Sequence, residues 1–206
     1  MGSEMCIRDR QEAVPVGTGA MAAILGLEAQ KVVEGCAEAL RMLGTNSGEA
    51  VEAANFNDPA QTVIAGSKAA VDKACEVLKG MGAKRALPLP VSAPFHSSLM
   101  KPAAEKLKQR LAGTNIQSPR IPVVNNIEVK VETDPDRIRA ALYEQAFGPV
   151  RWVECVRAIQ ARGISTLVEC GPGKVLAGLV KRIDGSLQSG AVYDPATLAE
   201  VKGVLA

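Results

Sequence analysis

The sequence GAMAAILGL, from Gly19 to Leu27, begins the part of the chain that decides the fold. It is a short apolar run bounded by glycines, which predicts a buried strand. From Ala29 to Leu43, apolar residues recur at spacings of three and four, and Gly44 follows. That spacing predicts a helix that ends at the glycine. A strand followed by an amphipathic helix therefore starts the fold.

Two strand-like pieces come next, Ala50 to Asn55 and Gln61 to Gly66 (QTVIAG). Between them stands Asn57-Asp58-Pro59, in which Asx side chains and the fixed proline φ favour a turn. The pattern predicts a β-hairpin.

Ser67 is placed to cap a second helix that ends near Gly80 and Gly82. Ala86 to Val91 then predicts a strand. Because Pro88 and Pro90 interrupt it, the strand is expected to lie at an edge or to leave the sheet there. The predicted order is β-α-β-β-α-β, the ferredoxin-like split βαβ arrangement, and it spans residues of about 20 to 91.

The rest of the chain alternates predicted helices and strands. The helices are Ala103 to Leu111, Arg137 to Gln145, Val150 to Arg162 and Val175 to Arg182, and the strands are Ile121 to Asn125 and Ser165 to Glu169. Such alternation favours a parallel α/β layer. Beyond Asp184 the pattern is weak, and a last helix is expected from Pro195 onward. The fold class expected for the whole chain is α/β.

Composition excludes several classes of function. The net charge is +2 and the basic residues form no stripe, so nucleic acid is not an expected partner. Every apolar run is too short to cross a membrane. The five cysteines include no CxxC pair, and no histidine stands at zinc-site spacing. We therefore expect a soluble, cytoplasmic protein with reduced thiols and no metal.

The first ten residues, MGSEMCIRDR, differ from the rest. They contain no apolar region or cleavage site of a secretory signal, and no periodicity joins them to the residues after Arg10. Residues 1–10 are interpreted as a foreign leader, with an upstream part of the natural protein expected to be missing.

His96 is the only histidine, and it stands in SAPFHSSLMKP between the interrupted strand and a helix. Loops at strand ends often carry catalytic groups, and neutral imidazole suits the removal of a hydroxyl proton near pH 7. The alternative is a surface histidine or a hydrogen-bonding residue at a helix start. The residues alone leave both open.

The segment around His96, PFHSSLMKPAAEKL, is preceded by GAKRALPLPVSA and followed by PVVNN. Together with EAVPVGTGAMAAILGL, NFNDPAQTVIAG, GPVRW and VECGPGKVLAGLVKRI, it resembles the malonyl-CoA:acyl carrier protein transacylases in the same order. The likeness covers about Gln11 to Ile183. It implies that residues 20–91 form a small ferredoxin-like subdomain inserted into an α/β-hydrolase-like domain, of which residues 92–206 are a C-terminal part.

The resemblance also implies a reaction. In this family a serine in a GHSxGE elbow takes malonyl from coenzyme A and passes it to the pantetheine thiol of acyl carrier protein. By resemblance, His96 is the base that activates the serine, and the main chain of Gln145 orients its imidazole. A solvated residue at a helix end is the alternative interpretation of Gln145. The implied partners are malonyl-CoA and acyl carrier protein, with no further cofactor.

Three more residues receive implied roles in substrate binding. The bulk of Phe95 would disfavour a methyl branch on the acyl group. The effect would be a preference for malonyl, because one methyl is worth only about 1–3 kcal/mol in a pocket. Plain core packing is the alternative. Asn55 and Asn57 would face the cleft, although turn chemistry explains them equally well. The GPGK sequence at 171–174 is interpreted as a tight turn in preference to an anion site.

The chain also departs from the family. It has no GHSxGE and no early GQG segment, and Cys6 stands where the family's malonyl-binding arginine is expected. We therefore expect an inactive fragment of an enzyme that is monomeric at full length. The alternatives are an acyltransferase fragment of a polyketide synthase and a non-catalytic module that binds acyl carrier protein.

Overall fold

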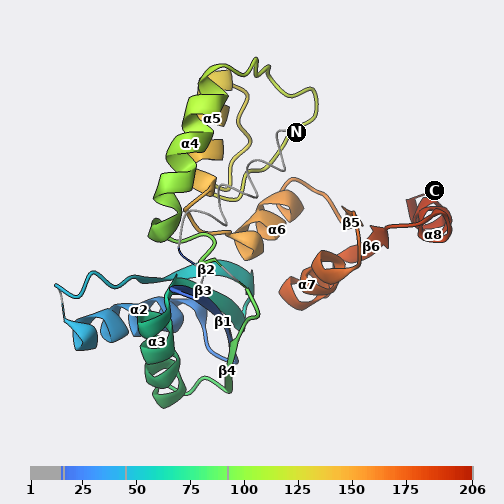
Figure 1. Ribbon diagram of the computed structural model, residues 1–206. Helices are drawn as coiled ribbons and strands as arrows, with labels where there is room; N and C mark the ends of the chain where they lie inside the picture. Colours follow the sequence, from blue (N-terminus) through green and yellow to red (C-terminus); the bar gives the residue numbers. More distant parts are fainter. Residues whose placement is uncertain (1–14, 16, 45, 92, 206) are drawn as a thin grey trace. The chain divides into compact units, whose positions relative to one another are not determined.

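The computed structural model describes residues 15, 17–44, 46–91 and 93–205 (Figure 1). The chain divides into two compact units, the first ending at Trp152 and the second beginning at Val153. The expected foreign leader, residues 1–10, lies outside the described residues. Among the residues that are described, no helix is both long and apolar enough to span a bilayer.

The first unit is built on a four-stranded antiparallel sheet. Its strands are β1 (Gly19–Leu25), β2 (Val51–Asp58), β3 (Gln61–Ser67) and β4 (Arg85–Pro88), in the spatial order β2-β3-β1-β4. Helices α2 (Ala29–Leu43) and α3 (Lys68–Gly80) connect β1 to β2 and β3 to β4. The predicted β-α-β-β-α-β order is therefore the observed one.

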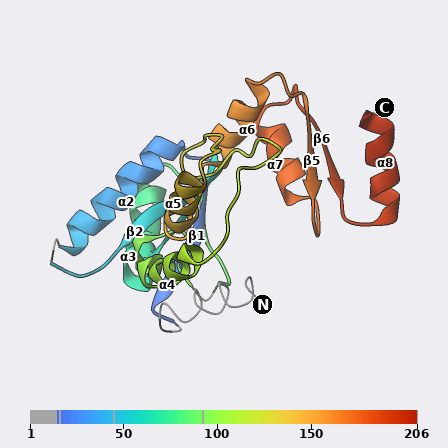
Figure 2. The same ribbon diagram turned by 90° about the horizontal axis from the view of Figure 1, so that it is seen from above.

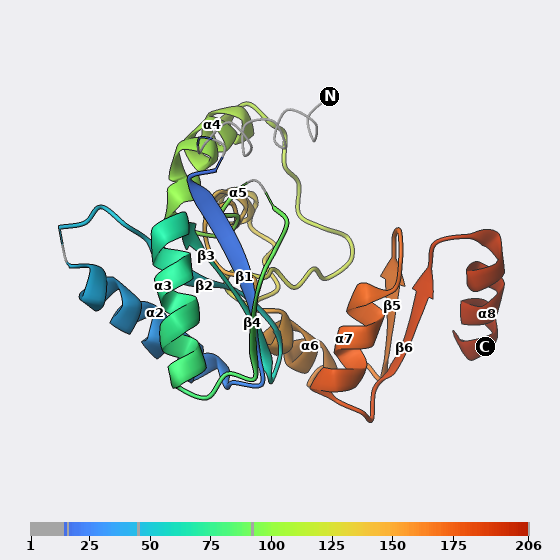
Figure 3. The same ribbon diagram turned by 60° about the horizontal axis from the view of Figure 1, so that its bottom comes forward.

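Helices α2 and α3 lie side by side on one face of this sheet (Figures 1 and 3). The core layer between these helices and the sheet is aliphatic, and its large buried members include Ile24, Val32, Ile64 and Leu78. The other face carries a smaller cluster: Met21, Ala23, Ala54, Val63 and Ala65. Leu89 and Phe95 pack against this second cluster. The segment after β4 thus covers the face opposite the helices.

The hairpin is present, but its turn is displaced from the predicted one. Strand β2 continues through Asn55 and Asn57 to Asp58, which pairs with Gln61. The turn is therefore a two-residue one, and the side chain of Asp58 accepts a hydrogen bond of 2.9 Å from the N–H of Ala60. An Asx turn built on the aspartate leaves both asparagines in the strand, so turn chemistry does not explain Asn55 and Asn57.

Ser67 occupies the N-cap position of α3, as predicted, with φ −68° and ψ 147°. Its side chain makes no capping bond to the helix. The hydroxyl bonds instead to the carboxylate of Glu49 and to the main chain of Ala50, because β3 ends beside the start of β2. The predicted capping hydrogen bond is therefore wrong.

The first unit continues with a 3₁₀ turn, η1 (Ser98–Met100), and two packed helices, α4 (Lys101–Ala112) and α5 (Pro135–Gln145). The predicted strand at Ile121 to Asn125 is wrong, because only Val124 forms a bridge, to Val131. Ile121 is 76% exposed. A β-branched run becomes a strand only beside a partner strand, and none of the described strands lies along this one.

The second unit contains a parallel pair of strands, β5 (Thr166–Cys170) and β6 (Gln188–Val192), which lie side by side in Figure 2. Helices α7 (Val175–Ile183) and α8 (Pro195–Leu205) pack on them. The parallel α/β layer is confirmed here. The strand β6 was not predicted, because QSGAV contains two polar residues and a glycine in five.

Helix α6 (Trp152–Gln160) begins two residues later than predicted. The reason is that Val150 pairs with β2. Its N–H donates to the carbonyl of Ala54 at 2.8 Å, and its own carbonyl accepts from the N–H of Phe56 at 2.9 Å. A residue held in this extended pairing cannot also begin a helix.

Candidate active site

His96 stands in the loop that follows β4, with its backbone in the left-handed region at φ 61°. This conformation is unfavourable for a residue with a side chain, by about 1–2 kcal/mol. The loop is seated on β1, where a Cβ on Gly19 would lie only 2.4 Å from Cδ of the buried Pro94. The absence of a side chain at Gly19 therefore lets the loop approach the sheet.

Hydrogen bonds on both sides of His96 hold this conformation. The buried hydroxyl of Ser97 donates to the carbonyl of Pro94 at 2.7 Å. The N–H of Ser98 donates to the carboxylate of Glu52 on β2 at 3.1 Å. The N–H of Phe95 donates to the carbonyl of Ala93 at 3.0 Å. Strain of this kind is kept only where the surroundings determine it, and such places are often functional.

The imidazole of His96 contacts two main-chain carbonyls. Its Nδ1 lies 3.3 Å from the carbonyl oxygen of Gln145, at the end of α5, and 3.2 Å from that of Gly148. A carbonyl oxygen can only accept, so Nδ1 must carry the proton in both contacts. The neutral ring then has its lone pair on Nε2, the form that a base at Nε2 requires. His96 and Gln145, both predicted site residues, are thus brought together.

The segment from Gly148 to Arg151 connects these carbonyls to the sheet. The pairing of Val150 with β2 forms a parallel bridge between Val150 and Asn55. The N–H of Arg151 donates to the carbonyl of Asn126 at 3.3 Å. Asn55, another predicted site residue, therefore lies in the strand that anchors the carbonyl-bearing segment. Asn57 is half-buried near the end of the same strand.

Phe95 is half-buried and packs against the cluster on the sheet face opposite the helices. This contact favours the interpretation of Phe95 as a core residue. Its place next to His96 in the sequence is still compatible with a role in substrate binding. Gly148 and Glu52 are site residues that sequence reasoning missed. The GPVRW segment, which contains Gly148, could have drawn attention to it, whereas nothing near Glu52 distinguishes it from other strand residues.

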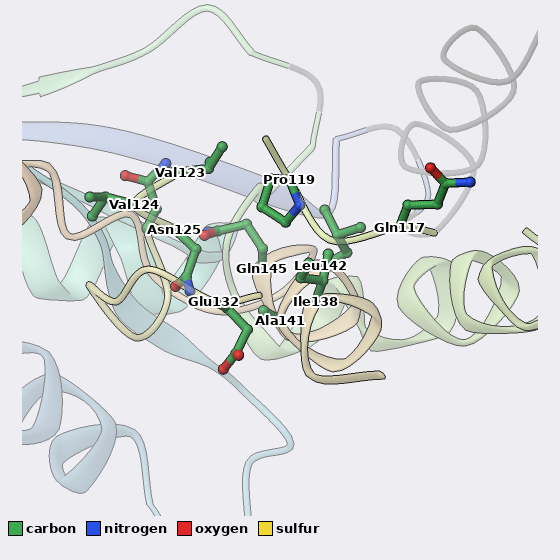
Figure 4. A pocket seen from close by; sticks show the side chains of 11 residues that line it. Gln117, Pro119, Val123, Val124, Asn125, Glu132, Ile138, Ala141, Leu142 and Gln145 are labelled. Atoms are coloured by element: carbon green, nitrogen blue, oxygen red, sulfur yellow. The ribbon is translucent and has the colours of Figure 1, made fainter. Parts of the chain in front are cut away.

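A pocket of about 400 Å³ lies between α5 and residues 117–132 (Figure 4). Apolar side chains line most of it, including Val123, Ile138 and Leu142. Gln145 also lines the pocket, and its side-chain amide donates to the carbonyl of Pro149 at 3.4 Å. The side chain of Gln145 thus faces this pocket while its main chain contacts His96.

The remaining chemical candidates are structural. Burial raises the pKa of the Cys36 thiol to about 12, which keeps it protonated and unreactive. Among the described cysteines, Cys36, Cys75, Cys155 and Cys170, no disulfide is formed, and Cys6 lies outside the described residues. In the described part of the chain, no three His, Cys, Asp or Glu residues are grouped closely enough to hold a metal ion.

The GPGK segment joins β5 to α7, with Gly173 at φ 94°. The carboxylate of Glu169 accepts a hydrogen bond of 2.9 Å from the N–H of Ala177, in the first turn of α7. A helix N-terminus that already holds a carboxylate is a poor site for another anion. The interpretation of GPGK as a turn is favoured.

An α/β chain with a histidine oriented by main-chain carbonyls fits the acyltransferase class suggested by its sequence. No family model matches the chain. It is 50% identical over 196 residues, 95% of its length, to the malonyl CoA-acyl carrier protein transacylase of Escherichia coli K12, and 47% identical over 91% to that of Bacillus subtilis. These alignments cover 62% and 57% of the two relatives.

Solved structures agree. A Burkholderia pseudomallei acyl-carrier-protein S-malonyltransferase is 59% identical with a TM-score of 0.89, and 95% of this chain covers 62% of that one. A malonyl-transacylase solved in complex with a type II polyketide acyl-carrier protein is 48% identical with a TM-score of 0.90, at the same coverage. The chain is therefore homologous to part of the malonyl-CoA:acyl carrier protein transacylases, and the resemblance seen in the sequence is confirmed. It spans about three fifths of the length of these relatives.

Proposed function

We propose that this chain is the histidine-bearing part of a malonyl-CoA:acyl carrier protein transacylase. One observation carries the proposal. The single histidine, in a strained loop, directs Nδ1 at the carbonyls of Gln145 and Gly148, as a base at Nε2 needs. The 50% identity to a relative of that name gives independent support. The proposed enzyme works in fatty acid biosynthesis.

The proposed reaction has two halves, both using a serine that the sequence does not contain in a GHSxGE setting. In the first, the serine oxygen bonds to the malonyl carbonyl carbon and the bond to the coenzyme A sulfur breaks. The serine proton passes to Nε2 of His96 and on to that sulfur. In the second, the pantetheine thiol gives its proton to Nε2, its sulfur bonds to the malonyl carbon, and serine leaves with the proton.

The proposed substrate and partner are those that this reaction requires. Malonyl-CoA donates the acyl group and acyl carrier protein accepts it, and the malonyl-transacylase solved together with an acyl-carrier protein supports this partner. The coenzyme A thioester is the substrate, and the reaction needs no further cofactor or metal. Phe95 would disfavour a methyl branch, and Asn55 and Asn57 would face the acyl group from β2. A monomer is proposed for the full-length enzyme.

The proposed domain organisation uses the observed topology. The antiparallel order β2-β3-β1-β4 with two helices on one face supports a ferredoxin-like subdomain over residues of about 20–91. The parallel β5-β6 pair with its helices supports an origin of residues 92–206 in an α/β-hydrolase-like domain. The subdomain would then supply Glu52 and Asn55 to the loop and segment around His96.

The experiment joins this chain to a segment carrying the family's GHSxGE elbow. Radiolabelled malonyl-CoA should label the joined protein, and the label should pass to acyl carrier protein. His96→Ala should slow this transfer by at least about a thousandfold. If no malonyl-enzyme forms, or if His96→Ala transfers at the unchanged rate, the proposal is wrong.

The similarity to a malonyl-transacylase that was solved in complex with a type II polyketide acyl-carrier protein favours a second candidate with the same chemistry. This candidate is a transacylase that serves a polyketide acyl carrier protein. Comparing acyl carrier proteins from fatty acid and polyketide synthesis as acceptors separates the two. The non-catalytic alternative predicts that this chain binds acyl carrier protein while the joined protein forms no malonyl-enzyme.

A further inference from the structure

We propose that Gly148 is a positioning residue for His96. The Nδ1 proton of the imidazole is shared between the main-chain carbonyls of Gly148 and Gln145. The assignment of a catalytic purpose to this contact rests on the function proposed above. The contact itself is a property of this chain and can be tested without any transfer reaction.

The geometry around Nδ1 is that of one donor with two acceptors. The distances to the oxygens of Gln145 and Gly148 are 3.3 and 3.2 Å. Both exceed the roughly 2.9–3.0 Å usual for a single N–H···O bond. Nearly equal, slightly long distances are expected when one N–H is shared. With the proton on Nε2 instead, Nδ1 would have a lone pair facing two carbonyl oxygens, which would repel it. Two acceptors therefore favour the Nδ1-protonated tautomer more strongly than one acceptor would.

The carbonyl of Gly148 is fixed from both sides. The N–H of Gly148 donates to the carbonyl of Glu144 at 2.7 Å, at the end of α5. Two residues further on, Val150 is paired with β2. The peptide between these anchors has little freedom to rotate. Gly148 therefore couples the orientation of the imidazole to both α5 and the sheet.

The absence of a side chain at this position allows the arrangement. A Cβ on residue 148 would lie 2.3 Å from Cδ1 of Ile127 and 2.9 Å from the carbonyl oxygen of Glu144. Both distances are shorter than real Cβ contacts, and the second involves main chain that cannot yield without moving α5. Any larger residue must displace the carbonyl at 148. The close approach of these neighbours is therefore the reason for a glycine at position 148. A left-handed backbone is not the reason, because Gly148 is not among the glycines with positive φ.

The first test is the tautomer of His96 in this chain, by ¹⁵N–¹H correlation NMR of the imidazole at a pH where the ring is neutral. Because His96 is the only histidine, its signals need no assignment. We expect a single tautomer with the proton on Nδ1. The opposite tautomer, or a mixture, overturns the proposal, since free imidazole side chains in water favour the proton on Nε2.

The second test uses Gly148→Ala, with Gly113→Ala as a matched control. Gly113 is the C-cap residue directly after α4, and a Cβ there would approach nothing closer than 3.9 Å. Gly148→Ala should give a mixture of tautomers and the control should not. Ile127→Val removes only Cδ1, so Ile127→Val with Gly148→Ala should restore part of the Nδ1 form. Unchanged imidazole signals in folded Gly148→Ala would overturn the role of Gly148.

A reciprocal measurement avoids any change at residue 148. In His96→Ala, the main-chain carbonyl ¹³C signals of both Gln145 and Gly148 should move, because both lose a hydrogen bond. Movement at Gln145 alone overturns the proposal. These results do not depend on malonyl transfer. In the joined enzyme, Gly148→Ala should lower kcat by about 10- to 100-fold with KM for malonyl-CoA unchanged, and failure of the joined enzyme would leave the NMR results standing.

Discussion

The carboxylate of Glu52 accepts a hydrogen bond of 3.1 Å from the main-chain N–H of Ser98, two residues after His96. Glu52 lies on β2, 46 residues earlier in the chain. The bond joins the sheet to the far end of the strained loop. Because the acceptor is charged, such a bond contributes about 1.5–3 kcal/mol. The side chain of Glu52 is therefore expected to support the backbone conformation of His96.

Glu52→Ala should lower the free energy of unfolding by about 1.5–3 kcal/mol, as measured by urea denaturation. Glu52→Gln keeps an acceptor oxygen at the same reach and should lose only about half as much. Glu76→Ala is the matched control. Its carboxylate is an exposed partner of Lys73, for which about 0–1 kcal/mol is expected. Equal losses for Glu52→Ala and Glu76→Ala would contradict the prediction.

The backbone strain at His96 can be measured by comparing two variants that both lack the imidazole. At φ 61°, glycine is unstrained whereas alanine is not. His96→Gly should therefore be more stable than His96→Ala by about 1 kcal/mol. The same pair at Ser98, which lies in a 3₁₀ turn, should show no such preference for glycine. An alanine variant as stable as the glycine variant at position 96 would argue against strain in solution.

Local patterns predicted the first half of the fold because each element there is explained by its own residues. The helix at Ala29–Leu43 has the predicted bounds, since an apolar stripe and a terminal glycine are both local signals. The strand predicted at Ile121 to Asn125 failed for the opposite reason. A strand depends on a partner from elsewhere in the sequence, and β-branched content cannot show whether one is present.

The residues of the candidate site also differ in whether the local sequence points to them. His96 was prominent as a lone histidine in a loop, but its pairing with Gln145 came only from the family resemblance. Glu52 and Gly148 act through contacts 46 and 52 residues away in sequence from Ser98 and His96. A carboxylate in a strand is common, so no local pattern distinguishes Glu52. Gly148 could have been noticed only because it begins the GPVRW segment of the family resemblance.

The buried Cys36 thiol predicts how stability depends on pH. Burial is the largest cause that raises its pKa, from 9.0 to about 12. Above pH 9 the unfolded chain releases this proton while the folded chain retains it, so the folded state loses stability as pH rises toward 12. The difference in unfolding free energy between wild type and Cys36→Ala should shift by roughly 2–4 kcal/mol across that window. A difference that stays constant from pH 8 to 11 would contradict a raised pKa.

Phe95 separates two interpretations that the structure leaves side by side. It packs against the cluster on the sheet face opposite the helices, and it directly precedes the proposed base. If its ring also limits the acyl pocket, Phe95→Ala in the joined enzyme should raise kcat/KM for methylmalonyl-CoA relative to malonyl-CoA by about tenfold or more, because a methyl group is worth about 1–3 kcal/mol.

Leu89→Ala provides the control, because Leu89 packs against the same cluster of Met21, Ala23, Ala54, Val63 and Ala65. Both truncations should destabilise the protein in urea denaturation, by about 1–3 kcal/mol for partly buried side chains. Only Phe95→Ala should change the ratio of the two substrates. If the two variants alter stability alike and neither changes that ratio, Phe95 is a core residue, and the malonyl preference must come from another part of the enzyme.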